Sequence, residues 1–393
     1  MDNLQHTVYN VLLGSDLINI ALIILAAGLS ERMGVFKPLL PVGEQPAVLR
    51  CIHTAESAGI RSIYVVTGHM HAEIENVLRT NTPGVRLVHN SDYRDGMFSS
   101  ACSGVSALPK GLDGFFLLPA DCCAVSPETL AKLIERFYEN AGSLVTRPKY
   151  QGRRGHPPLI PAQSIDPLLT YNGENGLKGL LSPLPTLEVE MASPDSLLDM
   201  DTPEDYAELL GYLDLPTYPD SAQCAELFKK YDTPPDIIEH GDHVAALAVK
   251  IARLMDDCGE NTDLALLKSA CLLHDICRMK PDHARAGFEL LLREGYPKAA
   301  ILVGNHMDLQ GFEGVIGEAE LLFLADKLCR RGKLTTLEDT MAENEARYAK
   351  VPAALDAVKK RIKTAQEIFD ALKTRYGIGY EEMLRSLTLV SEL

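Results

Sequence analysis

Short apolar runs alternate with amphipathic segments over roughly the first half of the chain. The apolar runs have the length of buried strands, and each ends at small or polar residues; they are 20–25, 62–66, 85–88 and 115–118. The segments between them that repeat apolar residues at helical spacing are 47–58, 72–78 and 128–137. Alternating strands and helices predict an α/β fold with a doubly wound sheet over residues 20–213.

The strand pattern disappears after Asp-Leu-Pro-Thr-Tyr-Pro at 214–219, which we interpret as a linker. Beyond it, apolar residues recur at helical spacing, as in the stripe formed by Leu266, Ala270 and Leu273. The pattern predicts an all-α domain over 220–393, in which 353–376 forms a long helix. Residues 1–19 are interpreted as an N-terminal extension without an assigned role, and residues 336–393 carry no motif.

Composition places the chain among ordinary globular proteins and narrows the classes of partner. The sequence is 46% hydrophobic and 23% charged, and its formal net charge is -16. Duplex nucleic acid and anionic membrane surfaces both require a basic face, so we expect neither as a partner. An anionic small molecule remains compatible with this charge if basic residues are concentrated locally.

The sequence indicates a cytoplasmic protein. The N-terminus shows no secretory signal, and no apolar stretch is long enough to span a bilayer. The nine Cys residues are an odd number and do not resemble a disulfide framework, which favours a reducing compartment.

The end of the first apolar run has the composition of a phosphate-binding loop. Its small residues let backbone N–H groups close around an anion; the predicted nucleotide-binding residues are Leu25, Ala26, Ala27 and Gly28. Arg32 and Lys37 follow and can neutralise phosphate charge. Neither the Walker pattern nor Gly-x-Gly-x-x-Gly is present, so another type of nucleotide loop, a turn followed by a short helix, is expected.

Asp121 closes the apolar run at 115–118 and is expected at the ligand-binding edge of the sheet. A carboxylate there suits Mg²⁺, which prefers oxygen ligands completed by substrate phosphates. The alternative is a helix cap, but Ser126 is the more obvious cap for the helix that follows.

The loop Leu-Ala-Ala-Gly-Leu-Ser-Glu-Arg-Met-Gly and the following Lys37-Pro-Leu-Leu-Pro resemble the molybdopterin-type nucleotidyltransferases, most closely the molybdenum cofactor cytidylyltransferases. The resemblance implies a Rossmann-like domain that transfers CMP from CTP to a molybdopterin-type cofactor phosphate and releases pyrophosphate. It also implies that Asp201, in Asp-Met-Asp-Thr-Pro-Glu-Asp, joins Asp121 at Mg²⁺, with Lys37 and Arg32 orienting the triphosphate. Read without the resemblance, that segment is merely a helix start.

The same resemblance assigns further contacts. Ser99 and Ser100 open a helix whose N–H groups and hydroxyls are expected to bind the nucleotide. Residues that resemble the acceptor-binding segments of the family are Arg154, Gly155, His156 and Lys178. CTP is preferred to GTP because the loop reads Ala-Ala-Gly, as in the cytidylyl group. The resemblance also suggests molybdoenzyme maturation proteins as partners. Cys122-Cys123 after Asp121 departs from the family pattern and bears on the identity of the acceptor.

The helical domain carries histidines and aspartates that could ligate metal. His274 extends an apolar stripe, and a lone His there would more often be a core residue. The ordered set resembles that of the HD-domain phosphohydrolases, and its expected ligands are His240, His274, Asp275, His283, His306 and Asp326. The resemblance implies two ions and a phosphate contact from Arg278. Mixed imidazole and carboxylate ligation suits Mn²⁺, Fe²⁺ or Zn²⁺.

Two alternatives remain open on the sequence. The nucleotidyltransferase could act on another phosphorylated acceptor, such as a sugar or alditol phosphate. The helical domain could bind a nucleotide or metal as a sensor and hydrolyse nothing, although the intact pair His274-Asp275 favours catalysis by metal-dependent hydrolysis of a phosphomonoester or nucleotide.

Overall fold

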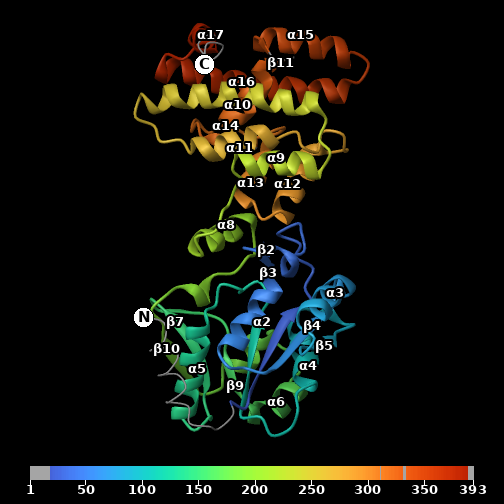
Figure 1. Cartoon of the computed structure of the whole chain (residues 1–393), viewed down its shortest axis with the longest axis vertical. Helices are drawn as coiled ribbons and strands as arrows, with labels where there is room; N and C mark the ends of the chain where they lie inside the picture. Colours follow the sequence, from blue (N-terminus) through green and yellow to red (C-terminus); the bar gives the residue numbers. More distant parts are fainter. Residues whose placement is uncertain (1–17, 310, 331–332, 388–393) are drawn as a thin grey trace. The chain divides into compact units, whose positions relative to one another are not determined.

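The computed structural model describes residues 18–309, 311–330 and 333–387 (Figure 1). The chain divides into two compact units, Met1–Asp205 and Tyr206–Leu393. Of the extension expected at 1–19, only residues 18 and 19 are among those described. In the described part of the chain, no helix is both long and apolar enough to cross a membrane.

The first unit is built from strands and helices in alternation. Its strands are β1 (Ile20–Ala26), β2 (Pro41–Val42), β3 (Gln45–Pro46), β4 (Ser62–Thr67), β5 (Arg86–His89), β6 (Gly114–Pro119), β7 (Val145–Tyr150), β8 (Arg153–Arg154), β9 (Leu159–Pro161) and β10 (Thr186–Glu190). Its helices are α2 (Ala47–Ser57), α3 (His71–Asn81), α4 (Met97–Ser106), α5 (Pro127–Glu139), α6 (Ile165–Thr170) and α7 (Gly176–Leu181), with 3-10 turns at Lys37–Leu39, Tyr93–Asp95, Ala162–Ser164 and Asp195–Leu197. Helix α8 (Pro203–Tyr212) begins at the end of this unit.

The main sheet has the order β10-β7-β9-β6-β1-β4-β5. Strands β6, β1, β4 and β5 are parallel, so their carboxyl ends meet at one edge. Strand β9 runs antiparallel to both β6 and β7, which makes the sheet mixed. The α/β fold class is confirmed; the sequence pattern did not reveal the antiparallel strand, because three apolar residues give no direction.

Successive side chains of a strand point to opposite faces of the sheet, and each face is covered by its own helices. Ala21, Ile23 and Leu25 of β1 face a core shared with α4, α6 and α7. Helix α4 approaches closely because residue 104 is glycine: a Cβ there would lie 2.5 Å from Ile23 Cγ2. Helices α2 and α5 lie in front of the sheet in Figure 1.

The segment after β1 differs in detail from the expectation. A short helix was expected after the loop, but residues 31–35 form turns, and the 3-10 turn at Lys37–Leu39 follows. Gly34 has φ of +77°, which ends the local turn, and Pro38 restricts the backbone of the next one.

The second unit is helical. Its helices are α9 (Ser221–Lys230), α10 (Pro235–Asp256), α11 (Leu264–Leu273), α12 (His283–Arg293), α13 (Pro297–Asn305), α14 (Glu318–Leu328), α15 (Leu337–Tyr348), α16 (Pro352–Tyr376) and α17 (Tyr380–Leu387). A hairpin of β11 (Cys329–Arg330) and β12 (Lys333–Leu334) was not expected from the sequence. The segment 214–219, expected to be a linker, runs between α8 and α9 and contains no helix.

The contact between α10 and α11 brings metal-ligand candidates of this unit together. Helices α10 and α11 pack closely because residue 241 is glycine: a Cβ there would lie 2.6 Å from the carbonyl oxygen of Leu272. This contact holds His240 of α10 beside the carboxyl end of α11. Helix α11 ends at Leu273, so His274 and Asp275 lie in the turn after the helix and not within it.

Candidate active sites

Two carboxylates from distant parts of the sequence meet at Lys37. The Lys37 ammonium pairs with Asp121, at the end of β6, and lies 2.9 Å from Asp201 Oδ1, just before α8. Arg32 Nη2 lies 2.8 Å from the other oxygen of Asp201. The structure thus brings together the four residues predicted for catalysis in this unit. Because Asp121 and Asp201 converge on one cation, they fit the carboxylate pair that Mg²⁺ uses in nucleotide sites.

The loop before Lys37 is held by Ser30, which sequence reasoning had not selected. Ser30 Oγ accepts a hydrogen bond from the backbone N–H of Lys37 at 3.1 Å, and its carbonyl accepts one from Gly34. Ser30 has φ of +57°, an uncommon conformation for a residue other than glycine. Gly28 is exposed, and a Cβ placed on it would meet no atom within 4 Å. The loop therefore leaves open space beside its backbone, as a nucleotide cradle requires.

The charges in this cluster depend on one another. Burial disfavours the Lys37 ammonium, but the carboxylates of Asp121 and Asp201 together outweigh burial and raise the pKa of Lys37. Asp199 lies near the same carboxylates; burial, reinforced by Asp201 and Asp121, raises its pKa. Because its pKa is raised, Lys37 stays protonated at neutral pH.

Ser99 and Ser100, the predicted nucleotide contacts on α4, share one hydrogen-bond donor. Asn90, at the end of β5, donates hydrogen bonds of 3.0 Å to the hydroxyl oxygens of both Ser99 and Ser100. Ser100 is buried, whereas Ser99 is partly exposed and lines a pocket of about 750 Å³ together with Lys178 and Gly173. The structure thus brings Ser99 and Lys178 to one pocket.

The residues predicted to bind the acceptor differ in exposure, packing and hydrogen bonding. Arg154 is exposed, and its Nε donates to Glu188 Oε1 at 2.6 Å. Gly155 is required for packing, since a Cβ there would lie 2.4 Å from the carbonyl oxygen of Ser196. The ring of His156 follows it, and its Nδ1 is buried without a hydrogen-bond partner.

Arg147 and Ser196 were missed by sequence reasoning and lie near His156. Arg147 Nε and Ser196 Oγ are both buried without a hydrogen-bond partner. Burial lowers the pKa of His156, and the charge of Arg147 lowers it further. Unpartnered buried polar atoms are costly, so these three atoms could bind a polar ligand. No sequence motif marked Arg147, because it lies within strand β7.

In the helical unit the predicted ligands converge from different helices. His240 Nε2 lies 3.2 Å from Asp326 Oδ1, and His274 Nε2 lies 3.5 Å from the same oxygen. His283 Nε2 and His306 Nε2 lie 3.2 and 3.6 Å from Asp275 Oδ1. His274, Asp275 and His306 are buried, so the cluster forms part of the interior.

Backbone carbonyls fix the orientation of two of the imidazoles. His274 Nδ1 donates to the carbonyl of Cys271 at 2.7 Å, and His306 Nδ1 donates to that of Val303 at 2.6 Å. In each neutral ring Nε2 is then an acceptor that faces a carboxylate, and His274 Nε2 has no hydrogen-bond partner. Two acceptors that face each other need either a proton or a metal cation between them. The arrangement therefore fits metal ions, whose histidine ligands are oriented in this way.

Two ligand groups share one carboxylate. The atoms of His240, His274 and Asp275 lie within 4.8 Å of one another, and so do those of Asp275, His283 and His306. Burial opposes ionisation of Asp275, but contacts with His283 and His306 outweigh it and lower its pKa well below the ordinary value. Hydrogen bonding to Asp326 raises the pKa of His240 to about 9. Asp275 is the residue that could bridge two ions.

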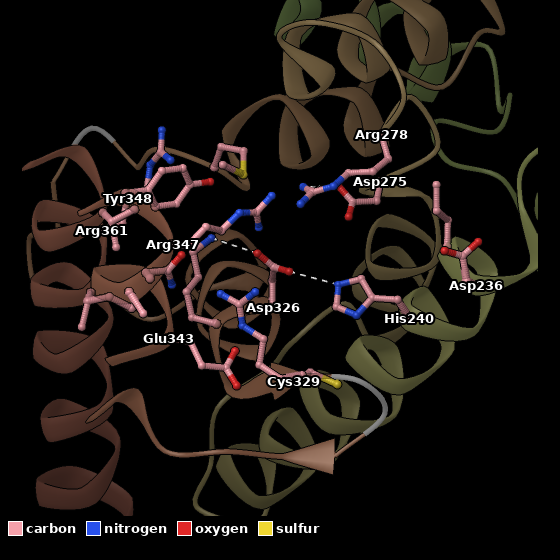
Figure 2. A pocket seen from close by; sticks show the side chains of 18 residues that line it. Asp236, His240, Asp275, Arg278, Asp326, Cys329, Glu343, Arg347, Tyr348 and Arg361 are labelled. Atoms are coloured by element: carbon pink, nitrogen blue, oxygen red, sulfur yellow. Dashed lines mark hydrogen bonds and ion pairs between the residues drawn. The ribbon is translucent and has the colours of Figure 1, made fainter. Parts of the chain in front are cut away.

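The cluster opens into a pocket of about 680 Å³, drawn in Figure 2. His240, Asp275, Arg278 and Asp326 line it. Arg278 Nη1 lies 3.5 Å from Asp275 Oδ1, and its side chain is 44% exposed, so it can contact a ligand in the pocket. His243, one turn after His240, bonds instead to the carbonyl of Glu239 and belongs to neither ligand group.

Lys327 was not selected from the sequence, although it follows Asp326. Its buried ammonium donates to Asp326 Oδ2 at 3.1 Å and to the carbonyl of His306 at 2.7 Å. Burial lowers the pKa of Lys327, while Asp326 opposes this effect. Lys327 therefore ties two of the ligand-bearing segments together.

The first unit is thus a mixed sheet with a Lys-carboxylate cluster at one edge, and the second unit is a helical domain with a histidine and aspartate cluster. Residues 22–189 match the family model of the MobA-like NTP transferase domain, and residues 237–331 match that of the HD domain. The chain thus contains a MobA-like NTP transferase domain followed by an HD domain, and both resemblances seen in the sequence are confirmed.

Individual relatives match about a third to a half of the chain. The molybdenum cofactor cytidylyltransferase of Escherichia coli (strain K12) is 28% identical over 184 residues, which are 47% of this chain and 92% of that protein. A bifunctional IPC transferase and DIPP synthase of Rubrobacter xylanophilus is 30% identical over 131 residues, 32% of this chain and 29% of that protein. A solved nucleotidyl transferase from a Methanothermobacter species shares 26% identity, with a TM-score of 0.43, over 49% of this chain and 96% of its own.

Proposed function

We propose that the first domain transfers CMP from CTP to the phosphate of a molybdopterin-type cofactor and releases pyrophosphate. The observation that carries the proposal is the convergence of Asp121 and Asp201 on Lys37, behind the open loop at Gly28. The choice of acceptor and of CTP is supported by the Escherichia coli relative, a molybdenum cofactor cytidylyltransferase.

In this mechanism a terminal phosphate oxygen of the acceptor attacks the α-phosphorus of CTP in line. A new P–O bond forms, the bond to the β-phosphate oxygen breaks, and pyrophosphate leaves. Lys37 and Arg32 neutralise and orient the triphosphate, while Asp121 and Asp201 would hold Mg²⁺. A bound Mg²⁺ would offset the charge that develops on the phosphate oxygens. No nucleophile from the protein is needed.

Three side chains are suited to the acceptor. Arg147, His156 and Ser196 have buried polar atoms without partners, and a phosphate-bearing acceptor would satisfy them. Lys178 and Ser99, on the pocket beside α4, are a second polar surface for the nucleotide or the acceptor.

A second acceptor class competes with the first. The Rubrobacter relative has a different name, bifunctional IPC transferase and DIPP synthase, so an acceptor other than molybdopterin, such as a sugar or alditol phosphate, is the second candidate. The test is to incubate the full chain with Mg²⁺, labelled CTP or GTP, and either molybdopterin or a sugar or alditol phosphate, to measure pyrophosphate release and to identify the labelled product. We expect product only from CTP and molybdopterin. Exclusive formation of an alditol or sugar nucleotide would reject the molybdopterin acceptor.

We further propose that the HD domain hydrolyses a phosphate ester and is not merely a sensor. The observation that carries this proposal is the complete pair of ligand groups that share Asp275. Arg278 would bind the scissile phosphate, and the ligands would hold Mn²⁺, Fe²⁺ or Zn²⁺, which would polarise the phosphate and make a water molecule more nucleophilic. Replacing His274 and Asp275 together with Ala should abolish Mn²⁺-dependent phosphatase activity and spare nucleotidyl transfer. Unchanged hydrolysis in this variant would reject the proposed site.

A further inference from the structure

The pocket beside the metal-ligand cluster has a wall that the HD match does not include. The match ends at residue 331, whereas α15 and α16 contribute further residues to the pocket. Figure 2 shows Arg347, Tyr348 and Arg361 on these helices, on the opposite side of the pocket from His240 and Asp275. A ligand at the metal-ligand cluster therefore faces side chains of the HD-matched segment and side chains of α15 and α16.

This second wall is basic. Arg347 and Arg361 line it, and Arg330 of β11, which lies inside the HD match, lines the same pocket. Among the described lining residues the acidic groups outside the metal-ligand set are Asp236 and Glu343. With Arg278, four guanidinium groups thus line the pocket, against two carboxylates outside the metal-ligand set. Concentrated positive charge in a chain whose net charge is -16 is a local feature that favours an anionic ligand.

The three arginines other than Arg278 differ in how they are held. Arg361 donates to both oxygens of Asp308, at 2.8 and 2.6 Å, and is thereby fixed in the wall. Arg347 lies over the Tyr348 ring, with Cζ 5.3 Å from the centroid, and no carboxylate among the described residues forms an ion pair with it. Arg330 Nε is buried and has no hydrogen-bond partner. Arg330 and Arg347 are thus two cations whose donors are available to a ligand.

We propose that Arg330 and Arg347 bind a second, non-scissile phosphate, so that the HD domain acts on phosphate esters that carry two phosphate groups, such as nucleoside bisphosphates. The inference rests on the proposed phosphohydrolase function for the scissile phosphate. In that reaction a water oxygen bonds to the phosphorus, the ester P–O bond breaks, and the leaving oxygen takes a proton. Planar guanidinium groups match phosphate oxygens, and a cavity of about 680 Å³ is large enough for a nucleotide.

The kinetic test compares adenosine 3′,5′-bisphosphate with adenosine 5′-monophosphate, using the full chain and Mn²⁺. Arg347→Ala and Arg330→Ala should lower kcat/KM for the bisphosphate about tenfold or more, because each removes a charge-assisted hydrogen bond, and should change that for the monophosphate less than about twofold. Lys363→Ala is the matched control, since Lys363 is on α16, is 79% exposed and does not line the pocket. Equal losses for both substrates, or no loss, would overturn the proposal.

A binding measurement separates this proposal from the proposed activity. Isothermal titration of the full chain with adenosine 3′,5′-bisphosphate should show a binding event that is weakened by Arg347→Ala and Arg330→Ala and retained in Lys363→Ala. If that event is present but the wild type hydrolyses neither nucleotide, the phosphohydrolase function fails and the two-phosphate pocket stands. If hydrolysis occurs but neither arginine affects binding, the two-phosphate pocket is wrong. Arg347 is exposed, so its replacement leaves the fold intact.

Discussion

Asp121 and Asp201 lie far apart in the sequence, yet both carboxylates contact the ammonium group of Lys37. One follows a buried strand, and the other precedes helix α8, where Thr202 and Asp205 exchange hydrogen bonds at the helix start. The same segment therefore starts a helix and presents a carboxylate to the site, so the two readings that its sequence allowed are compatible.

Replacing Asp121 with Asn should reduce nucleotidyl transfer by roughly a thousandfold and leave phosphatase activity unchanged, because the amide cannot supply a charged oxygen ligand. Asp166→Asn, at an exposed position on α6, is the control and should leave both activities unchanged. Activities measured on the same preparations check this. Loss of both activities in a folded Asp121→Asn protein would show that the two sites are not independent.

Two glycines should separate stability from nucleotide binding. Gly104→Ala places a Cβ 2.5 Å from Ile23 Cγ2 and should lower the free energy of unfolding by about 1–3 kcal/mol. Gly28→Ala meets no atom within 4 Å and should leave stability unchanged, but its methyl group would occupy the proposed cradle and raise KM for CTP. Denaturant titration and steady-state kinetics on both variants test this. A normal KM in Gly28→Ala would place the nucleotide elsewhere.

Ser30 should act through Lys37. Ser30→Ala removes the hydroxyl that accepts the Lys37 N–H and keeps a side chain at φ of +57°, so it should cost about 1 kcal/mol of stability and reduce nucleotidyl transfer. Ser30→Gly relieves the backbone but also lacks the hydroxyl; its stability should recover while its activity stays low. If activity follows stability across both variants, Ser30 has a purely structural role.

Metal content should reveal the shared carboxylate. We expect two ions per chain in the wild type, fewer than one in Asp275→Asn, and about one in His283→Ala, because Asp275 belongs to both ligand groups and His283 to one. Elemental analysis after loading with Mn²⁺ measures this. Removing metal with a chelator should also lower the unfolding temperature, since a ligand at a thousandfold excess over its Kd contributes about 4 kcal/mol. Equal metal content in both variants would rule out Asp275 as a bridging ligand.

Thiol chemistry should distinguish exposed from buried cysteines. Cys258 is exposed, whereas Cys51 is buried, and burial raises the pKa of Cys51 well above the ordinary value. At pH 8 a thiol reagent should therefore modify Cys258 rapidly in the native protein and reach Cys51 only after unfolding. Cys258→Ser should remove the rapid phase. A rapid phase that persists when the half-buried Cys102 is also replaced by Ser would mean that a buried thiol becomes accessible in the native state.

The sequence predicted most of the element types, because long periodic segments leave little ambiguity. The expected strands at 62–66 and 115–118 are observed as β4 and β6, and the expected helix at 353–376 as α16. The antiparallel strand β9 and the hairpin of β11 and β12 were missed, because runs of two or three residues carry no usable period.

The candidate sites were predictable where a residue follows a strand or belongs to a motif. Asp121 and His274 have such signals, and the structure places them in the two clusters. Arg147, Arg330 and Arg347 have no such signal, because each is a basic residue within a helix or strand. Only the fold shows that Arg147 Nε and Arg330 Nε are buried without a hydrogen-bond partner, and that Arg330 and Arg347 line a pocket. Their assigned roles remain predictions to be tested.

The pocket in Figure 2 is partly lined by residues of α15 and α16, which lie beyond the end of the HD match at residue 331. A protein truncated there would keep all of its proposed metal ligands and lose one side of the cavity. Proteins trimmed to the family boundaries would therefore retain the chemistry of the ions but select substrates differently from the full chain.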